Sequence, residues 1–155
     1  YPLEAVGAGD STLAKAYERD ALTMIPTKSK LMPHAREVLE YLSGKYNLYI
    51  LSNGFKELQS HKMRSSGIDE YFKKVVLSDD IGILKPWPEI FHFALSTTQS
   101  ELNNSLMIGD SWENDIVGAA GVGMHQVFYN LSGRTDLPFA PTYQITDLKD
   151  LFNFL

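Results

Sequence analysis

The stretch SLMIGDSWEND, residues 105–115, decides the fold. Its opening residues 105–108, the last three of them apolar, predict a short buried strand, and Gly109 ends it. Asp110 follows at the tip of the strand, and Asp115 lies where the next helix is expected to begin. Because open α/β sheets bind ligands at the carboxyl ends of their strands, the pattern places two carboxylates at a ligand-binding edge.

Two interpretations of this stretch remain open when it is taken alone. Carboxylate oxygens are the ligands that Mg²⁺ prefers, together with waters and phosphate oxygens, so Asp110 and Asp115 are candidate metal ligands. The same acids also suit a helix N-terminus, where they cap backbone N–H groups and complement the helix dipole.

Length and composition exclude several classes of function. The chain has 155 residues, 44% of them hydrophobic, and therefore forms one domain or part of one. The net charge is −5 and no run of basic residues is present, which argues against a nucleic-acid polymer as partner. The absence of cysteine excludes disulfides, thiolate metal sites and a cysteine nucleophile. No apolar run reaches the roughly 18 residues of a membrane span, so we expect no membrane partner.

Helical and strand patterns alternate from residue 33 onward. We expect helices at 33–43, 55–66, from about 87 through 95, 113–120 and 148–154, and strands at 48–51, 74–77, 105–109, 125–130 and, weakly, 143–145. A further helix is expected at about 10–24, before a polar connector. This alternation predicts an α/β fold with a three-layer, Rossmann-like parallel sheet that carries helices on both faces.

Polar residues follow two further expected strands, in addition to Asp110 after the strand at 105–109. Ser52, Asn53 and Gly54 come directly after the apolar run LYIL, where a hydroxyl and backbone N–H groups can bind an anion. Lys85 precedes Pro86, and the proline biases the lysine toward an extended backbone. An ordinary turn explains Ser52–Gly54 equally simply, and a solvated surface lysine explains Lys85, so neither signal is decisive alone.

The combination is more informative than its parts. A hydroxyl, a lysine and two acids each lie in a loop at the end of a buried strand or before the next helix. This set suits phosphoryl transfer, in which catalysis depends on positioning and on neutralising charge with a metal ion and a lysine.

The same residues resemble the motifs of the haloacid dehalogenase superfamily. LYILSNG (48–54) is similar to its second motif, LKP (84–86) to its third and MIGDSWEND (107–115) to its fourth, in the right order across residues 33–130. Within the superfamily, the sequence most resembles the pyrimidine 5′-nucleotidase branch. Three segments carry this resemblance: LMPHAREVLEYL (31–42), ILSNGFKELQSHKMRSSGI (50–68) and SLMIGDSWENDIVGA (105–119).

The resemblance implies a role for each matching residue. Ser52 and the backbone amides of Asn53 and Gly54 would bind phosphate oxygens, and Lys85 would contact the phosphate and the nucleophilic carboxylate. Asp110 would coordinate Mg²⁺ directly. Asp115 would be the second acid of the metal site, where it orients either the metal shell or Lys85. The expected catalytic residues are therefore Lys85, Ser52 and Asp110.

The first motif of the superfamily, Asp-x-Asp on the central strand, is absent from residues 1–155. The resemblance assigns the nucleophile to that motif. We therefore expect residues 1–30 to be the C-terminal part of a helical cap and residues 31–155 to be a core that lacks its first, central strand. The expected strands at 48–51 and 105–109 would flank the missing one, so the chain is interpreted as a fragment that is inactive by itself and needs its missing N-terminal segment as partner.

These expectations lead to one preferred function and two alternatives. The preferred function is a Mg²⁺-dependent phosphatase of nucleoside 5′-monophosphates, acting on a small-molecule phosphate ester through an aspartyl-phosphate whose aspartate lies outside the chain. One alternative is another superfamily member, a sugar-phosphate or phosphoglycolate phosphatase or a dehalogenase. The other is a non-catalytic module that binds phosphate and metal. A cytoplasmic location is expected, since no targeting signal is visible.

Overall fold

The computed structural model describes residues 30–155, so the helix expected at about 10–24 lies outside the described residues. The described chain alternates strands with helical segments, in the order that the sequence predicts. The α-helices are α2 (Ala35–Ser43), α3 (Lys56–Ser66), α4 (Pro88–Thr98) and α5 (Val117–Gly121). The strands are β1 (Leu48–Ser52), β2 (Phe72–Leu77), β3 (Leu106–Gly109), β4 (His125–Tyr129) and β5 (Tyr143–Ile145).

All strand pairings among these residues are parallel, which confirms the predicted sheet type. Strand β1 pairs with β2, and Ser52 lies opposite Leu77 at the carboxyl end. Strand β3 pairs with β4, which pairs with β5 on its other side. The chain therefore forms an α/β fold with parallel strands and intervening helices.

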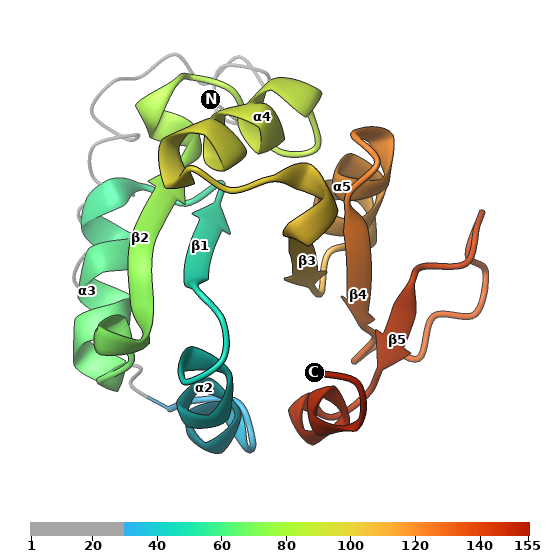
Figure 1. The fold of residues 1–155 in the computed structure, drawn as a ribbon, viewed down its shortest axis with the longest axis horizontal. Coiled ribbons are helices and arrows are strands. Elements are labelled where there is room, and N and C mark those ends of the chain that lie inside the picture. Colours follow the sequence, from blue (N-terminus) through green and yellow to red (C-terminus); the bar gives the residue numbers. More distant parts are fainter. Residues whose placement is uncertain (1–29) are drawn as a thin grey trace, which may run out of the picture.

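The strands form two separate sheets in the described part of the chain. One sheet has the order β1-β2 and the other β3-β4-β5, and no backbone pairing joins them within residues 30–155. Figure 1 shows β1 and β3 as the two strands that face each other across the molecule. Each therefore keeps one edge without a strand partner from this part of the chain.

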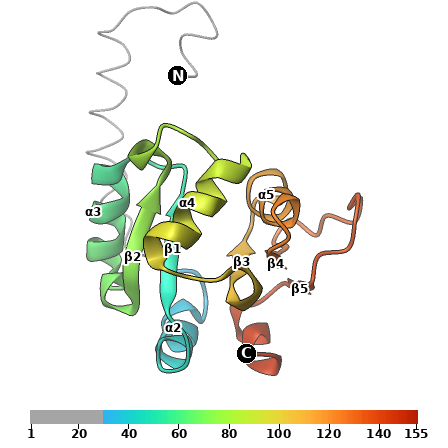
Figure 2. The ribbon, with the colours of Figure 1, turned by 45° about the horizontal axis from the view of Figure 1, so that its top comes forward.

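Helical layers on both sides hold the two sheets together. On one side, Val38 and Leu42 of α2 pack with Val127 of β4, and Leu48 and Leu106 from the two sheets join this cluster. The 3₁₀ helix Leu148–Asn153 contributes Leu151 to the same core. Figures 1 and 2 show α4 on the other side of the strands.

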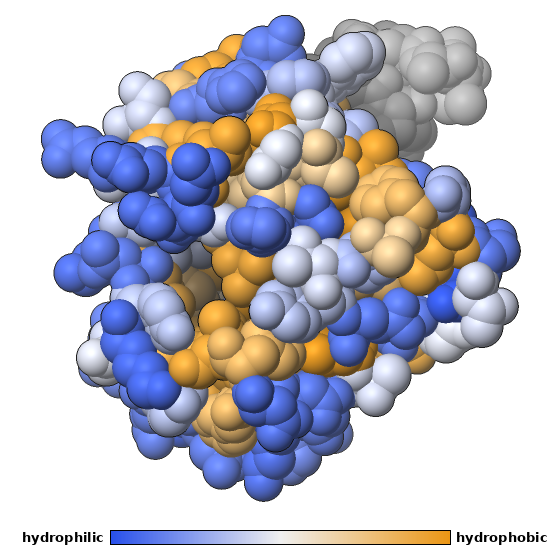
Figure 3. Space-filling model, turned by 45° about the vertical axis from the view of Figure 1, so that its right-hand side comes forward, coloured by the Kyte–Doolittle hydropathy of each residue, from blue (hydrophilic) through white to orange (hydrophobic). Residues whose placement is uncertain are grey.

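The second core belongs to α4 and α5. Ile90 and Phe91 of α4 pack with Ala119 of α5, and Leu51 of β1 and Met107 of β3 border them. Because successive side chains of a strand point to opposite faces, Leu106 and Met107 each reach a different helical layer. Figure 3 shows apolar side chains reaching the surface around a hollow in one face of the molecule.

Three helical segments differ from the prediction. The helix expected at 113–120 begins instead as a π-helical turn, Trp112–Ile116, because the carbonyl of Ser111 accepts from the amides of both Asp115 and Ile116. The last segment is 3₁₀ rather than α-helical, and the helix expected from Pro33 begins at Ala35. His34 takes a left-handed conformation (φ 62°) and separates Pro33 from the helix.

Candidate functional site

The loops after β1 and before α4 are joined directly. The Asn53 side chain accepts from the backbone N–H of Lys85 at 2.8 Å and donates to the Lys85 carbonyl at 3.1 Å. The Lys85–Pro86 peptide is cis. These two hydrogen bonds fix the backbone of Lys85 against the carboxyl end of β1, so the predicted neighbours Asn53 and Lys85 are in contact.

The Lys85 ammonium group is buried and ion-paired. Its Nζ donates to Asp115 Oδ1 at 2.6 Å and to the Leu51 carbonyl at 2.9 Å. Only 10% of the Lys85 side chain and 7% of the Asp115 side chain are exposed. A buried charge is costly unless it is paired and hydrogen-bonded, and both conditions are met here. The contact links the end of β1 to the turn that follows β3.

Asp115 is held in place by the turn that carries it. Its Oδ2 accepts from the Ser111 N–H at 3.1 Å, while the Ser111 hydroxyl caps the Asn114 N–H at 3.3 Å. Gly109 is required here, because a Cβ atom at this position would overlap the Asp115 carboxylate. Gly109 thus lets the Asp115 carboxylate lie against the end of β3 and reach Lys85.

Ser52 lies at the carboxyl end of β1, where the sequence predicts a phosphate-binding hydroxyl. Its Oγ accepts from the Gly54 N–H at 3.0 Å and from Gln59 Nε2 at 2.9 Å. A hydroxyl has two acceptor sites and one hydrogen, so these contacts direct the hydroxyl hydrogen toward a further acceptor. The three residues 52–54 precede α3, an 11-residue helix whose N-terminal N–H groups favour an anion.

Asp110 lies on the same turn but has a different environment. Its side chain is exposed, and no hydrogen bond or ion pair within residues 30–155 involves its carboxylate. It therefore presents oxygen ligands at the carboxyl end of β3. This is the donor chemistry that a hard cation requires.

The two expected metal ligands do not form a complete cation site by themselves. Both Asp115 oxygens already accept hydrogen bonds, one from Lys85 and one from the Ser111 amide. Within residues 30–155 no group of three or more His, Asp or Glu side chains is arranged to hold a metal ion. The residues present fit Mg²⁺ in chemistry through Asp110, while Asp115 is placed to orient Lys85, which is one of its two expected roles.

Some contributors could not be identified from the sequence. Gln59 contacts Ser52 from the first turns of α3, and the Leu51 carbonyl contacts Lys85 from β1. Gln59 lies seven positions after Ser52, and this spacing predicts a contact only when the conformation of the intervening turn is known. Trp112, which adjoins the site in sequence, is buried against Phe128 with ring centroids 5.2 Å apart.

Comparison with known proteins is consistent with this geometry. A model of the haloacid dehalogenase-like hydrolase family matches residues 3–123. The HAD-hydrolase YfnB of Bacillus subtilis is 31% identical over 157 aligned positions, which cover 100% of this chain and 64% of that protein. A crystal structure of YfnB bound to magnesium superposes with a TM-score of 0.77 at 30% identity, covering 84% of this chain and 57% of that one.

Two further relatives are named for different substrates. The pyrimidine 5′-nucleotidase YjjG of Escherichia coli is 31% identical over 126 residues, 80% of this chain and 56% of that protein. The glyceraldehyde 3-phosphate phosphatase of Pyrococcus abyssi is 38% identical over 99 residues, 63% of this chain and 42% of that protein. The aligned part of the chain thus spans between 42% and 64% of the length of these three relatives. The family match and the shared fold together establish that the chain belongs to the haloacid dehalogenase-like hydrolase family.

Proposed function

We propose that the chain forms most of the core of a Mg²⁺-dependent phosphomonoester hydrolase. The observation that carries this proposal is the buried Lys85–Asp115 pair, joined to Leu51 and Asn53 at the carboxyl ends of β1 and β3. A preorganised ammonium group in a site with little water is worth more than the same charge in solvent, because it stabilises charge that develops in the transition state.

Each residue has a distinct part in this proposal. The Ser52 hydroxyl and the Asn53 N–H bind phosphate oxygens, and Lys85 neutralises their charge. The Gly54 N–H, expected from the resemblance to bind phosphate as well, donates instead to Ser52 Oγ and so holds that hydroxyl in place. Asp110 is a ligand of Mg²⁺, which when bound adds a further positive charge beside the phosphate. Asp115 orients Lys85 by accepting a hydrogen bond from its ammonium group at 2.6 Å.

The nucleophile is proposed to reside on a strand that pairs with both β1 and β3. These two strands each have an open edge in residues 30–155, and the phosphate-binding groups lie at their carboxyl ends. A carboxylate there would attack phosphorus and displace the alcohol, and water would then hydrolyse the acyl phosphate to phosphate and free carboxylate. Residues 1–155 alone, which contain no Asp-x-Asp, are proposed to be inactive, and residues 1–30 to be the end of a cap.

A nucleoside 5′-monophosphate is the proposed substrate class, supported by the likeness to YjjG across 80% of this chain. The likeness to the glyceraldehyde 3-phosphate phosphatase favours a small sugar phosphate as the second candidate. The test compares kcat/KM of the full-length protein for nucleoside monophosphates, triose phosphates, phosphoglycolate and 2-haloacids, with and without Mg²⁺. Preference for a non-nucleotide ester would overturn the substrate assignment and leave the phosphatase assignment intact.

Substitution in the full-length protein tests the residue roles. Lys85→Ala and Asp110→Ala are each expected to lower kcat about 100-fold or more, the usual scale for one preorganised charge. Lys62→Ala removes an exposed lysine of α3 and serves as the matched control. Near-normal turnover in either site variant would remove that residue from the mechanism.

A non-catalytic binding module is the other candidate, favoured by the missing Asp-x-Asp. It predicts that residues 1–155 bind inorganic phosphate or Mg²⁺ in calorimetry and that the full-length protein hydrolyses no ester. Turnover by the full-length protein that depends on Lys85 would exclude it.

A further inference from the structure

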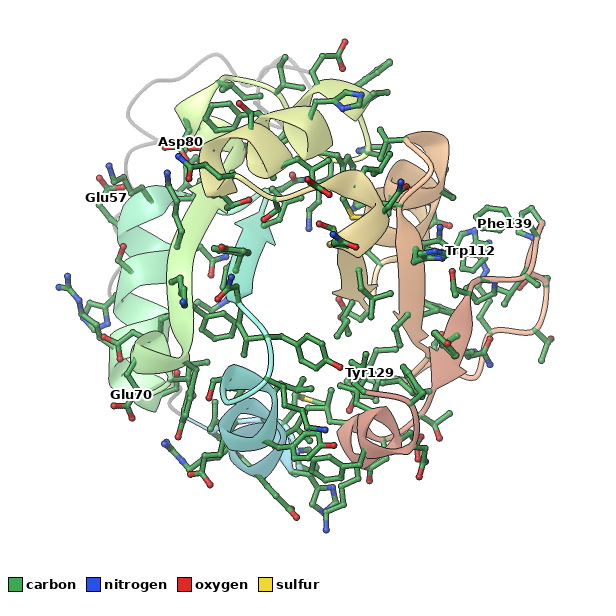
Figure 4. The ribbon with its side chains drawn as sticks, viewed as in Figure 1. Glu57, Glu70, Asp80, Trp112, Tyr129 and Phe139 are labelled. Atoms are coloured by element: carbon green, nitrogen blue, oxygen red, sulfur yellow. The ribbon has the colours of Figure 1, made fainter. Side chains whose placement is uncertain are left out.

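The loop between β4 and β5 packs onto the turn that carries Asp115. Trp112, in that turn, is 3% exposed and lies between two rings, Phe128 of β4 at 5.2 Å and Phe139 of the loop at 4.9 Å between centroids. Figure 4 shows Trp112 and Phe139 together on the loop side of β4, with Trp112 directed away from the space between β1 and β3. Trp112 therefore fixes the turn by packing and does not border the phosphate site.

Arg134 makes the polar part of the same contact. Its Nη1 donates to Glu113 Oε1 at 2.6 Å, and its guanidinium carbon lies 5.7 Å from the centre of the Trp112 ring. The backbone of Arg134 is itself fixed, because the Asn130 side chain accepts from its N–H at 2.9 Å and donates to its carbonyl at 2.8 Å. Asn130 is only 3% exposed, so this anchor is part of the protein interior.

The contacted turn is the one that links the two acids of the site. Glu113 and Trp112 lie between Asp110 and Asp115, and the turn is a single π-helical one, a form often found at functional sites. Its fourth residue is Asp115, whose carboxylate pairs with Lys85. A rotation of this turn would move Asp115 away from Lys85 and Asp110 away from its place at the strand end.

We propose that Arg134 is a positioning residue, which acts through Glu113 and Trp112 to set the geometry of the Asp110–Asp115 turn. This inference rests on the proposed metal-dependent function. The pair itself is too exposed to be important for stability: 29% of the Arg134 side chain and 69% of the Glu113 side chain are accessible, and exposed ion pairs contribute little. Its contribution is expected in metal binding and turnover and not in the melting temperature.

The test uses the full-length protein and measures Mn²⁺ binding by electron paramagnetic resonance beside kcat and KM. Arg134→Ala is expected to weaken Mn²⁺ binding about tenfold or more, the usual scale for residues that orient metal ligands, and to lower kcat with little change in KM. Arg134→Lys keeps the charge but not the planar fork and is expected to recover only part of the loss. Glu113→Gln removes the charge of the exposed partner of Arg134, so it tests the Arg134–Glu113 contact without risk to folding.

Arg36→Ala is the matched control. Arg36, a residue of α2, also makes two hydrogen bonds, but they join it to the carbonyls of Ser66 and Gly67 at the C-terminal end of α3 and not to the metal turn. Wild-type Mn²⁺ affinity and kcat in both Arg134→Ala and Glu113→Gln would overturn the inference. Mn²⁺ binding that weakens in these variants of a protein without phosphatase activity would support the inference and overturn the proposed function, whereas a wild-type protein that binds no Mn²⁺ would overturn both.

Discussion

Lys85 and Asp115 depend on each other for burial. Each is largely withdrawn from water, and each supplies the counter-charge for the other. Removing one partner of such a pair leaves an unpaired charge in the interior, which costs about 3–5 kcal/mol. Asp115→Ala is therefore expected to lower the free energy of unfolding of the full-length protein by this amount, as measured by urea denaturation.

The Glu37–Lys149 pair provides the control for that measurement. Its atoms are 3.4 Å apart and both side chains are about half exposed, so Glu37→Ala is expected to change the free energy of unfolding by less than about 1 kcal/mol. Equal effects of the two substitutions would contradict the view that burial makes the Lys85–Asp115 pair special.

Gly109 gives a second prediction at this scale. A methyl group there would occupy the space of the Asp115 carboxylate, so Gly109→Ala is expected to displace Asp115, to reduce turnover and to lower the free energy of unfolding by about 1–3 kcal/mol. Gly121→Ala is the control, because no atom lies within 4 Å of the added carbon and the residue ends α5. If both variants behave alike in activity and denaturation, close approach is not the reason for glycine at 109.

At the scale of single elements, the strands were more predictable than the helical turns. The apolar runs before Ser52 and Asp110 identified β1 and β3, because a continuous apolar run that ends on turn residues is typical of a parallel strand. Their side chains are only partly buried in residues 30–155. The π-helical turn could not be predicted, since residues 112–116 have a composition that also suits the first turn of an α-helix. The turn also places Trp112 against Phe128, a contact between residues of different elements that the local sequence does not reveal.

The contact between Arg134 and Glu113 could not be predicted for a similar reason. Arg134 lies in a polar loop 21 positions beyond Glu113, and only the placement of β4 beside β3 brings them together. The grouping of Ser52, Asn53, Lys85 and Asp115 could be predicted, because parallel strands place their carboxyl ends at the same edge of the fold.

The last 3₁₀ helix offers a pH-dependent test at the scale of one element. Asp147 caps this helix by accepting from the Lys149 N–H at 2.8 Å, and it also contacts His34 at 2.9 Å. The Lys149 N–H and then His34 lower the pKa of Asp147 below its usual value of 3.8. Because the folded-state pKa is lowered, the stabilisation is present above about pH 4 and is lost as the pH falls through the folded-state pKa.

Asp147→Asn should therefore be less stable than the wild type near neutral pH, with the difference in melting temperature shrinking below pH 4. His125→Gln, at another exposed histidine, controls for general effects of acid. A difference that stays constant from pH 7 to pH 3 would show that the charge of Asp147 does not stabilise the cap.

At the scale of the whole molecule, the two sheets are joined by helices and not by strands. Leu48 and Leu106 meet in one core, and Leu51 and Met107 border the other, so both helical layers bridge β1 and β3. Ile108 of β3 nevertheless remains 36% exposed, although it belongs to an apolar strand. Open strand edges and exposed apolar residues at the same place favour a further strand as their partner.

Hydrogen exchange tests that proposal directly. If a strand pairs with β1 and β3 in the full-length protein, the amides of both strands will exchange more slowly there than in residues 1–155. Strand β4 is the internal reference, because it already pairs on both sides with β3 and β5 and its protection needs no added strand. Amide protection that rises in β1 and β3 relative to β4 would identify β1 and β3 as the two strands that flank the added strand in one continuous sheet. Equal protection of β1 and β3 in both proteins would instead mean that the helical layers alone complete this fold.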